Sequence, residues 1–379
     1  MKKYLIKDLV DEISVRIDDP KTSGIERFVG LEHYDSGEVE VKRFGSTANL
    51  DSTMKVFKSG DILIARRNVY LRRAGIVYFD GLTSGDSIVL RPKNRRFQMI
   101  LPFIFNTDKF WDFATQFSDG SMSKRLSPKT LMEYEVFLPE EQGELEKIST
   151  LLWSFTKTLN SYKKLIVCSS ELLKARFVEL FKNTKNVKLG KCIEQIRGVS
   201  YKPIDLGEAE DNEHVILLRA NNILNNEINF DDLQFVSKEK IQNNQLIRKG
   251  DILVCASSGS KEHVGKAALC KFDRTATFGA FCKLIRTKNG LSPILLSEFF
   301  RSDEYRNYIN QIACGSNINN LRNEHFDNLE IPFPNKDEQA RFDDFVMKVN
   351  TSIENARKCF SKLHAAFQSI LNKSFNEEE

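Results

Sequence analysis

The chain has 379 residues, of which 41% are hydrophobic and 28% are charged. This balance is typical of a folded protein and excludes a disordered or collagen-like chain. At about 150 residues per domain, the length predicts two to three domains. The formal net charge of +4 is too small to indicate a nucleic-acid-binding protein by itself, so the distribution of the charges has to decide.

Membrane segments and metal sites are not expected. The longest apolar stretches, such as residues 99–105, are far shorter than the roughly 20 residues of a membrane helix, and the charged residues near the N-terminus predict no signal peptide. The seven cysteines are irregularly spaced and form no CxxC motif, so we expect reduced thiols and no zinc site. These features predict a cytoplasmic protein.

The sequence contains an internal repeat of about 190 residues. The tetrapeptide GDIL at 60–63 recurs at 250–253. The correspondence continues through a Gly-Ser pair followed by leucine (120–126 and 315–321), and through a segment from a proline to Glu-Gln (139–142 and 334–339). We therefore expect one structural unit that occurs twice.

Each unit has the same order of predicted elements. In the first unit, short β-rich runs at 27–31, 61–64, 75–79 and 87–90 are separated by glycine and Asx residues. One or two helices follow, at 98–117 in the first unit and 294–314 in the second. A proline-containing segment, which cannot be helix interior, then leads to a long amphipathic helix. The sequence therefore predicts an α+β fold.

The two closing helices carry hydrophobic residues at alternating intervals of three and four. This heptad spacing predicts a narrow stripe that packs on another helix. Because a whole domain separates the helices along the chain, we expect an antiparallel coiled coil that forms a spacer between two globular lobes. The alternative is that each helix packs on its own lobe. The predicted interface residues are Leu145, Ile148, Leu152, Phe155, Leu159, Val346, Val349, Ile353, Phe360 and Leu363.

Positive charge gathers in the same region of both repeats. Residues 58–129 contain 13 Lys or Arg against 6 Asp or Glu, and residues 248–322 contain 12 against 6. Such a region is suited to bind phosphate, although a solvated surface is the alternative.

Two loops in each unit are the candidate recognition surfaces. The loop after GDIL is rich in arginine in the first unit (65–75) and in serine in the second (256–265), and the Gly-Ser loop differs similarly. Arg suits guanine and phosphate, and Asn suits adenine. This predicts two different recognition surfaces, although drift between duplicated loops gives a similar pattern. The candidate DNA-binding residues are Arg66, Arg67, Asn68, Arg72, Arg73, Ser121, Lys124, Arg125, Ser257, Ser258, Lys261, Asn317, Asn319, Asn320 and Arg322.

Catalytic motifs are missing from the sequence. No GxGxxG follows a strand, no HExxH occurs, and the five histidines do not cluster. The segment 259–267 departs from a phosphate loop in its spacing and lacks the Ser or Thr that would hold magnesium. We therefore predict a binding subunit with no catalytic residue and no metal.

The order of lobe, long helix, lobe and long helix resembles the specificity (S) subunit of type I restriction-modification systems. The resemblance rests on GDIL in each lobe, the Gly-Ser loop and the Glu-Gln segment before each helix, and it covers almost the whole chain. It implies two target recognition domains, each reading one half of a split sequence in double-stranded DNA. It also implies two methyltransferase (M) subunits docked along the helices, and restriction (R) subunits bound through them.

According to this resemblance, S-adenosylmethionine and ATP with magnesium belong to the partners, and this chain needs no cofactor. The expected boundaries are 1–139 and 185–335 for the two target recognition domains, and 140–184 and 336–376 for the two spacer helices. Ser169 interrupts the first heptad stripe, and the second repeat has two extra residues before Glu338. The alternatives are a DNA- or RNA-binding adaptor and a stand-alone nucleic-acid-modifying enzyme with an unrecognised site.

Overall fold

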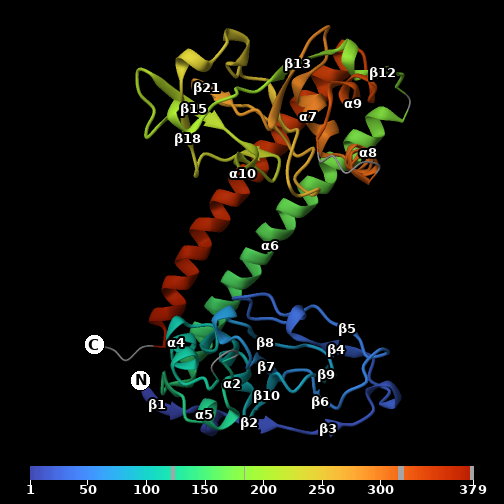
Figure 1. The fold of residues 1–379 in the computed structure, drawn as a ribbon. Coiled ribbons are helices and arrows are strands. Elements are labelled where there is room, and N and C mark those ends of the chain that lie inside the picture. The colour runs from blue at the N-terminus through green and yellow to red at the C-terminus, as the bar shows by residue number, and fades with distance from the viewer. Residues whose placement is uncertain (121–123, 183, 315–319, 376–379) are drawn as a thin grey trace. The chain divides into compact units, whose positions relative to one another are not determined.

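The computed structural model describes residues 1–120, 124–182, 184–314 and 320–375. The chain forms two compact units. Unit 1 is Met1–Lys164 together with Arg357–Glu379, and unit 2 is Leu165–Ala356. Each unit therefore contains one lobe and a part of both long helices, α6 and α10 (Figure 1).

The centre of unit 1 is an antiparallel sheet in which the strand order is β2-β10-β7-β8. Its strands are β2 (Val10–Ile13), β10 (Ser87–Pro92), β7 (Ile62–Ala65) and β8 (Ala74–Ile76). All four residues of β7 are apolar and buried. Ile62 and Ile64 belong to one hydrophobic cluster, and Leu63 and Ala65 belong to another. Because side chains alternate along a strand, both faces of the sheet are covered.

A second sheet of unit 1 has the order β3-β6-β9-β4-β5. Its strands are β3 (Arg16–Ile17), β6 (Met54–Phe57), β9 (Gly81–Thr83), β4 (Arg27–Val29) and β5 (Gly45–Ser46). Strands β4 and β9 are parallel, and the other pairs are antiparallel. A separate pair joins β1 (Lys2–Leu5) to β11 (Glu135–Leu138), which places the start of the lobe beside the segment that leads into α6.

The predicted helical segment at 98–117 is divided into short helices. They are α2 (Arg95–Gln98), α3 (Leu101–Ile104) and α4 (Asp108–Gln116), and α1 (Ile6–Leu9) and α5 (Pro128–Met132) lie elsewhere in the lobe. Pro102 stands in the first turn of α3, where proline is tolerated. The Thr107 hydroxyl accepts a hydrogen bond from the Phe110 N–H (3.2 Å) and begins α4. Pro102 and the Thr107 cap thus divide a segment for which one or two helices are predicted.

Unit 2 repeats the strand order of the central sheet of unit 1, but not that of the second sheet. Its central sheet has the order β13-β22-β19-β20, and its second sheet has the order β14-β18-β15-β21, with β15 and β21 parallel. β12 (Asn186–Lys188) pairs with β23 (Glu330–Pro332) as β1 pairs with β11. The remaining strands are β13 (Ile193–Arg197), β22 (Cys282–Thr287), β19 (Ile252–Cys255), β20 (Ala267–Leu269), β14 (Leu206–Gly207), β18 (Gln234–Ser237), β15 (His214–Leu218), β21 (Ala276–Phe278), β16 (Ile223–Leu224) and β17 (Glu227–Ile228).

The helices of the second lobe are α7 (Pro293–Arg301), α8 (Asp303–Cys314) and α9 (Asn323–Asp327). Ser302 separates α7 from α8, and its hydroxyl accepts a hydrogen bond from the Tyr305 N–H (3.2 Å). The segment 294–314, for which one or two helices are predicted, therefore forms two, because a capping residue interrupts it.

The GDIL motif forms the same turn and the same ion pair in both units. Gly60 and Gly250 have φ of 92° and 94°, a left-handed conformation that favours glycine. The Asp61 carboxylate accepts two hydrogen bonds from the Arg91 guanidinium, both 2.8 Å long. The Asp251 carboxylate accepts two from Arg286, at 2.8 and 2.7 Å. The repeated motif is therefore structural, and it neutralises one arginine in each of the two regions with excess positive charge.

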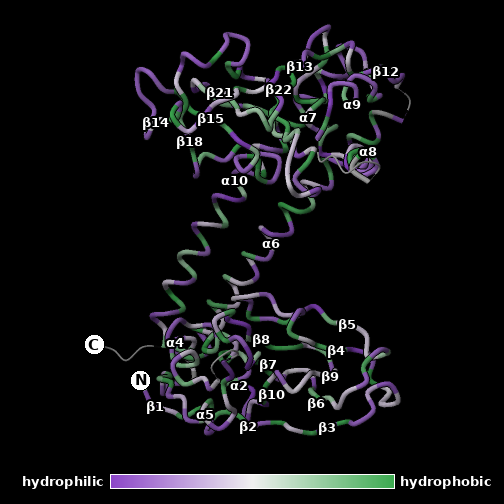
Figure 2. Tube along the Cα trace, viewed as in Figure 1, coloured by the Kyte–Doolittle hydropathy of each residue, from purple (hydrophilic) through white to green (hydrophobic). Residues whose placement is uncertain are grey.

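The long helices α6 (Gln142–Phe181) and α10 (Lys336–Lys373) run without a break, and α6 continues through Ser169. In unit 1, the rings of Phe155 and Phe367 lie 6.0 Å apart, and Lys163 lies 5.6 Å from the Phe360 ring. A later residue of α6 thus meets an earlier residue of α10, so the pair is antiparallel, as predicted. Figure 2 shows hydrophobic and hydrophilic residues alternating along both helices.

The predicted interface residues of the helices also join the lobe cores. Leu145, Leu152 and Leu159 belong to the main hydrophobic cluster of unit 1, with Ile148, Phe155, Phe360 and Leu363 packed against it. Val346 and Ile353 belong to the corresponding cluster of unit 2, and Val349 packs against it. The packing of the helices on the lobes, which the sequence left as an alternative, therefore exists together with the pairing of the helices.

Candidate nucleic-acid interface

The two candidate loops of unit 1 lie side by side. Arg67 and Arg125 are partners in an isolated antiparallel bridge. The Leu126 N–H donates to the Arg66 carbonyl (2.9 Å), and the Asn68 N–H donates to the Lys124 carbonyl (3.1 Å). Backbone pairing therefore brings the loop after β7 together with the loop before α5, although they are far apart in the sequence.

Unit 2 joins its two candidate loops in the same way. Ser257 and Asn320 are bridge partners, and the Leu321 N–H donates to the Ala256 carbonyl (2.7 Å). Because these contacts use only backbone atoms, the side chains of the loops can differ without changing the frame. The structure thus brings the predicted recognition loops together in both units.

A third segment, which the sequence analysis missed, lies against these loops. The Arg66 N–H donates to the Asp86 carbonyl in unit 1, and the Ala256 N–H donates to the Phe281 carbonyl in unit 2, both at 2.9 Å. Asp86 directly precedes β10, and Phe281 directly precedes β22. No motif marks these positions, because one residue is acidic and the other is aromatic. Their place before corresponding strands of the repeat is the signal that could have found them.

Asp86 lies between two of the candidate arginines. Its carboxylate is 3.2 Å from the Arg125 guanidinium and 3.7 Å from that of Arg67. The side chains of both arginines are about half exposed, at 49% and 43%. This cluster carries a net charge of +1 and presents two guanidinium groups that are held by one acid, a donor arrangement suited to phosphate or to the edge of guanine.

The neighbouring arginines of the same loop are bonded within the lobe. Arg73 donates to the carbonyls of Leu31 (3.0 Å) and Arg67 (3.1 Å). Arg72, which has a left-handed backbone, forms an ion pair with Asp108 at the start of α4. These contacts fix the loop, so the structure gives both residues a role that the sequence did not predict. A contact of Arg72 and Arg73 with DNA stays a prediction.

The remaining candidates occupy different environments. The Nε atom of Arg66 is buried and has no hydrogen-bond partner among the described residues. In unit 2, the Ser258 hydroxyl accepts a hydrogen bond from the Ser260 N–H (3.2 Å), Lys261 is exposed, and Arg322 lies 3.4 Å from Glu324. Three further candidates lie outside the described residues: Ser121, Asn317 and Asn319.

A cavity of about 430 Å³ opens beside the joined loops of unit 2. Ser257, Ser258 and Phe281 line one part of it, and Arg219 and Asn221 from the segment after β15 line another. Arg219 and Asn221 both donate to the Asp232 carboxylate, at 2.9 and 2.6 Å. The cavity is thus lined by polar side chains and by the aromatic side chains of Tyr201 and Phe281, next to the candidate reading loops.

Comparison with known proteins finds a similar domain and similar subunits. Residues 184–359 match the family described as type I restriction modification DNA specificity domain. This part of the chain is therefore similar to that specificity domain. The chain is similar to the StySPI specificity subunit of Salmonella potsdam (39% identity) and the EcoKI specificity subunit of Escherichia coli strain K12 (38%), in each case over 144 residues. Those residues are 38% of this chain but only 31% of each relative's length.

Solved structures extend the likeness in fold to the whole chain. The S subunit of a type I system from M. genitalium is 13% identical, with a TM-score of 0.63, over 100% of this chain and 96% of its own. A chain from a type I restriction-modification complex is 17% identical, with a TM-score of 0.56, over 98% and 97%. The fold expected from the resemblance to S subunits is thus confirmed. The lobe of unit 1 lies outside the matched range 184–359, but the strand order of its central sheet, its GDIL turn and its ion pair are the same as in unit 2.

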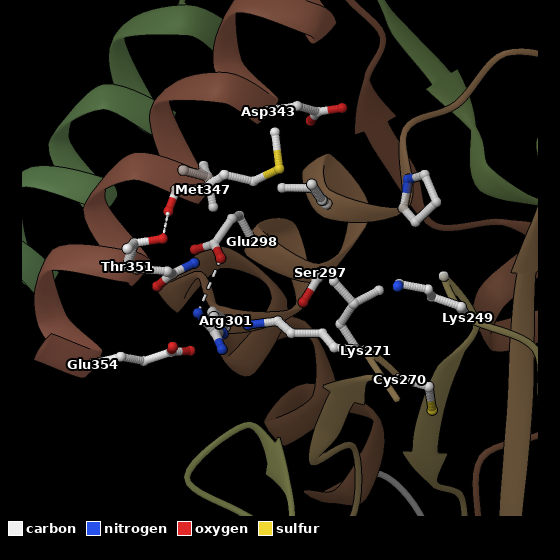
Figure 3. Close-up of a pocket in the computed structure, with 16 residues that line it drawn as sticks. Lys249, Cys270, Lys271, Ser297, Glu298, Arg301, Asp343, Met347, Thr351 and Glu354 are labelled. Carbon is white, nitrogen blue, oxygen red and sulfur yellow. Dashed lines mark hydrogen bonds and ion pairs between the residues drawn. The ribbon is translucent and has the colours of Figure 1, made fainter. Parts of the chain in front are cut away.

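Unit 2 has a second concavity, of about 500 Å³, between the GDIL turn, α7 and the first half of α10. Figure 3 shows Glu298 joined to Arg301, and Asp343, Met347 and Thr351 along α10. The Glu298 carboxylate lies 3.0 Å from the Arg301 guanidinium, and burial raises the pKa of Glu298. Burial also raises the pKa of Asp343, which accepts a hydrogen bond from Ser292 (2.7 Å). The Ser292–Asp343 hydrogen bond joins the start of α7 to α10, and the Glu298–Arg301 pair lies within α7, so we interpret this site as structural.

The described residues contain no group of three or more His, Cys, Asp or Glu side chains that could hold a metal ion. Cys192, Cys255, Cys270 and Cys282 are buried, whereas Cys168 and Cys359 on the long helices are exposed. Burial raises the pKa of the Cys270 thiol to about 12, which disfavours the reactive thiolate. None of the helices in the described ranges is long and apolar enough to span a bilayer.

Proposed function

We propose that this chain is the DNA sequence-recognition subunit of a type I restriction-modification complex, and that each unit reads one half of a split target. One observation carries this proposal beyond the family match. The two units hold their loops in the same backbone frame but present different side chains, with Arg67, Arg125 and Asp86 in one and Ser257 and Phe281 in the other. A duplicated frame with different donors and acceptors is what recognition of two different half-sites requires.

The two long helices set the gap between the half-sites and dock two M subunits in this proposal, and R subunits join through them. A helix of 40 residues is about 60 Å long at 1.5 Å per residue. Insertion of one heptad into each helix adds about 10 Å. The preferred gap should then grow by about three base pairs, since B-DNA rises about 3.4 Å per pair.

Catalysis belongs to the partners in this proposal. The M subunits would bind S-adenosylmethionine and transfer the methyl group, and the R subunits would bind ATP and magnesium. The proposal is supported by the missing cofactor and acid–base motifs in the sequence, since methyl transfer and cleavage both need such groups.

The test is to produce the full chain together with its M subunit in a host that lacks other methyltransferases, and to sequence the modified bases. We expect methylation at one split motif, and no methylation with either subunit alone. A matched pair of variants, Arg67→Ala in unit 1 and Ser257→Ala in unit 2, should each relax a different half of that motif.

Three results would argue against the proposal. Methyl transfer by the isolated chain would favour an enzyme, and selection of RNA from a mixed library would favour an adaptor. Relaxation of both halves by either variant would show that the units do not read independently.

A further inference from the structure

Position 281 of unit 2 corresponds to position 86 of unit 1. Ser87 pairs with Ala65 in the sheet of unit 1, and Cys282 pairs with Cys255 in the sheet of unit 2. The residue before each of these strands accepts the backbone hydrogen bond from the loop after GDIL. The two side chains therefore leave the same point of the same frame, beside the two loops that form the candidate interface.

The two side chains at this point have opposite surroundings. Asp86 is 25% exposed and is held between two guanidinium groups. Phe281 is 71% exposed and belongs to none of the hydrophobic clusters of the described residues. A single exposed apolar residue is common on protein surfaces. Phe281 differs from a scattered one because the Ser257 N–H donates to its carbonyl (3.0 Å) and both residues line the cavity.

The neighbours of Phe281 are suited to the edges of bases. Asn221, Gln234, Ser257 and Ser258 line the cavity with donors and acceptors, and Arg219 adds a guanidinium group. Polar groups of this kind read base edges in the major groove. The 5-methyl group of thymine is the apolar group in that groove, and an exposed phenyl ring suits it. An inserted wedge would instead unstack a base step and kink the duplex from the minor groove.

We propose that Phe281 determines specificity by making an apolar contact with the 5-methyl group of one thymine in the half-site that unit 2 reads. This inference rests on the proposed function, because it requires that unit 2 binds a DNA half-site. It assigns the cavity polar groups to the base pairs next to that thymine. It also explains why a phenylalanine stays exposed at a position where unit 1 has an acid, since DNA covers the ring in the complex.

The test profiles the full chain with its M subunit on a duplex library that is randomised at both half-sites. In the unit 2 half-site, Phe281→Ala should lose the preference for thymine at one position and keep the rest of the motif. Phe281→Leu, the matched apolar control, should retain that preference. Phe281→Asp, which installs the residue of unit 1, should favour cytosine there, because a carboxylate accepts a hydrogen bond from the cytosine amino group.

A second measurement isolates the methyl group. Replacement of that thymine by deoxyuridine removes the methyl and keeps the pairing. This should weaken binding of the unsubstituted protein about three- to tenfold, the range expected for burial of one methyl or methylene group with its contacts. The same replacement should leave binding of the Phe281→Ala variant unchanged.

The outcomes separate the two proposals. If the unsubstituted complex selects no split motif, the proposed function fails. If it selects one and Phe281→Ala selects the same motif, the inference about Phe281 is overturned. Blurring of the entire unit 2 half-site would indicate a structural role and would also overturn it. If permanganate reacts with an unstacked thymine and deoxyuridine has no effect on binding, the methyl contact is overturned and Phe281 acts as a wedge between bases instead.

Discussion

The duplicated ion pair provides a natural comparison of one interaction at two degrees of burial. The carboxylates of Asp61 and Asp251 are almost equally buried, with side chains 2% and 3% exposed. Their partners differ, since Arg91 is 39% exposed and Arg286 is 15% exposed. Substitution of each aspartate by asparagine removes the charge and keeps an oxygen that can accept the backbone N–H three residues earlier. The two variants therefore isolate the loss of the arginine's partner.

The expected cost depends on how well water can replace the lost carboxylate. Loss of one partner from a fully buried pair costs about 3–5 kcal/mol, because the remaining charge is left unpaired, whereas an exposed pair contributes about 0–1 kcal/mol. Arg286 is close to the first case, so Asp251→Asn should destabilise unit 2 by about 3 kcal/mol. Water reaches Arg91 more easily, so Asp61→Asn should destabilise unit 1 by about 1–2 kcal/mol.

Native-state hydrogen exchange measures the opening free energy of each unit within the full chain, because the protected amides of β7 and β19 report on units 1 and 2 separately. The slowest amides of β19 should lose more opening free energy in Asp251→Asn than those of β7 lose in Asp61→Asn. Equal losses would show that exposure of the arginine does not control the cost. Losses below about 0.5 kcal/mol in both variants would refute the structural role assigned to the motif.

Three further predictions concern other parts of the molecule. Leu152→Ala should destabilise unit 1 by about 2–5 kcal/mol, because Leu152 is fully buried. Its exposed neighbour Leu151 is the control, and its substitution by alanine should change the stability by no more than about 0.5 kcal/mol. Equal effects of the two substitutions in urea unfolding would contradict the packing described. Asp86→Ala adds one net positive charge beside Arg67 and Arg125. The slope of log K for DNA binding against log salt concentration should therefore become steeper by about one. An unchanged slope, measured by fluorescence anisotropy, would mean that this cluster does not contact phosphate. Burial raises the pKa of Asp343, so this carboxyl group stabilises the folded state at acid pH, and the effect is lost as the pH rises through the raised pKa. Asp343→Asn should therefore stabilise unit 2 more at pH 7 than at pH 4, and an equal gain at both would assign the effect to another cause.

The candidate interface was only partly predictable from the sequence. The loops that carry Arg67 and Ser257 could be found, because they follow a repeated motif and differ in their side chains. Their partners across the bridge could be named as candidates, but their contact with these loops arises from backbone pairing between distant segments. Asp86 and Phe281 could not be found by similarity, because the frame at that position uses only the backbone carbonyl. The bonding of Arg73 to two carbonyls likewise depends on the packed lobe.

The sequence by itself determined the features that depend on local pattern or on repetition. The duplication, the short buried strands, the glycine of the GDIL turn and the two long amphipathic helices follow from periodicity and from backbone preferences that act within a few residues. The tertiary structure decided which distant segments meet. It set where the helices at 98–117 begin and end, and it paired Asp61 with Arg91 and Asp251 with Arg286. It also placed Leu152 in a lobe core as well as in the helix stripe. Burial, charge pairing and backbone bridging act through space, so no pattern along the chain specifies them.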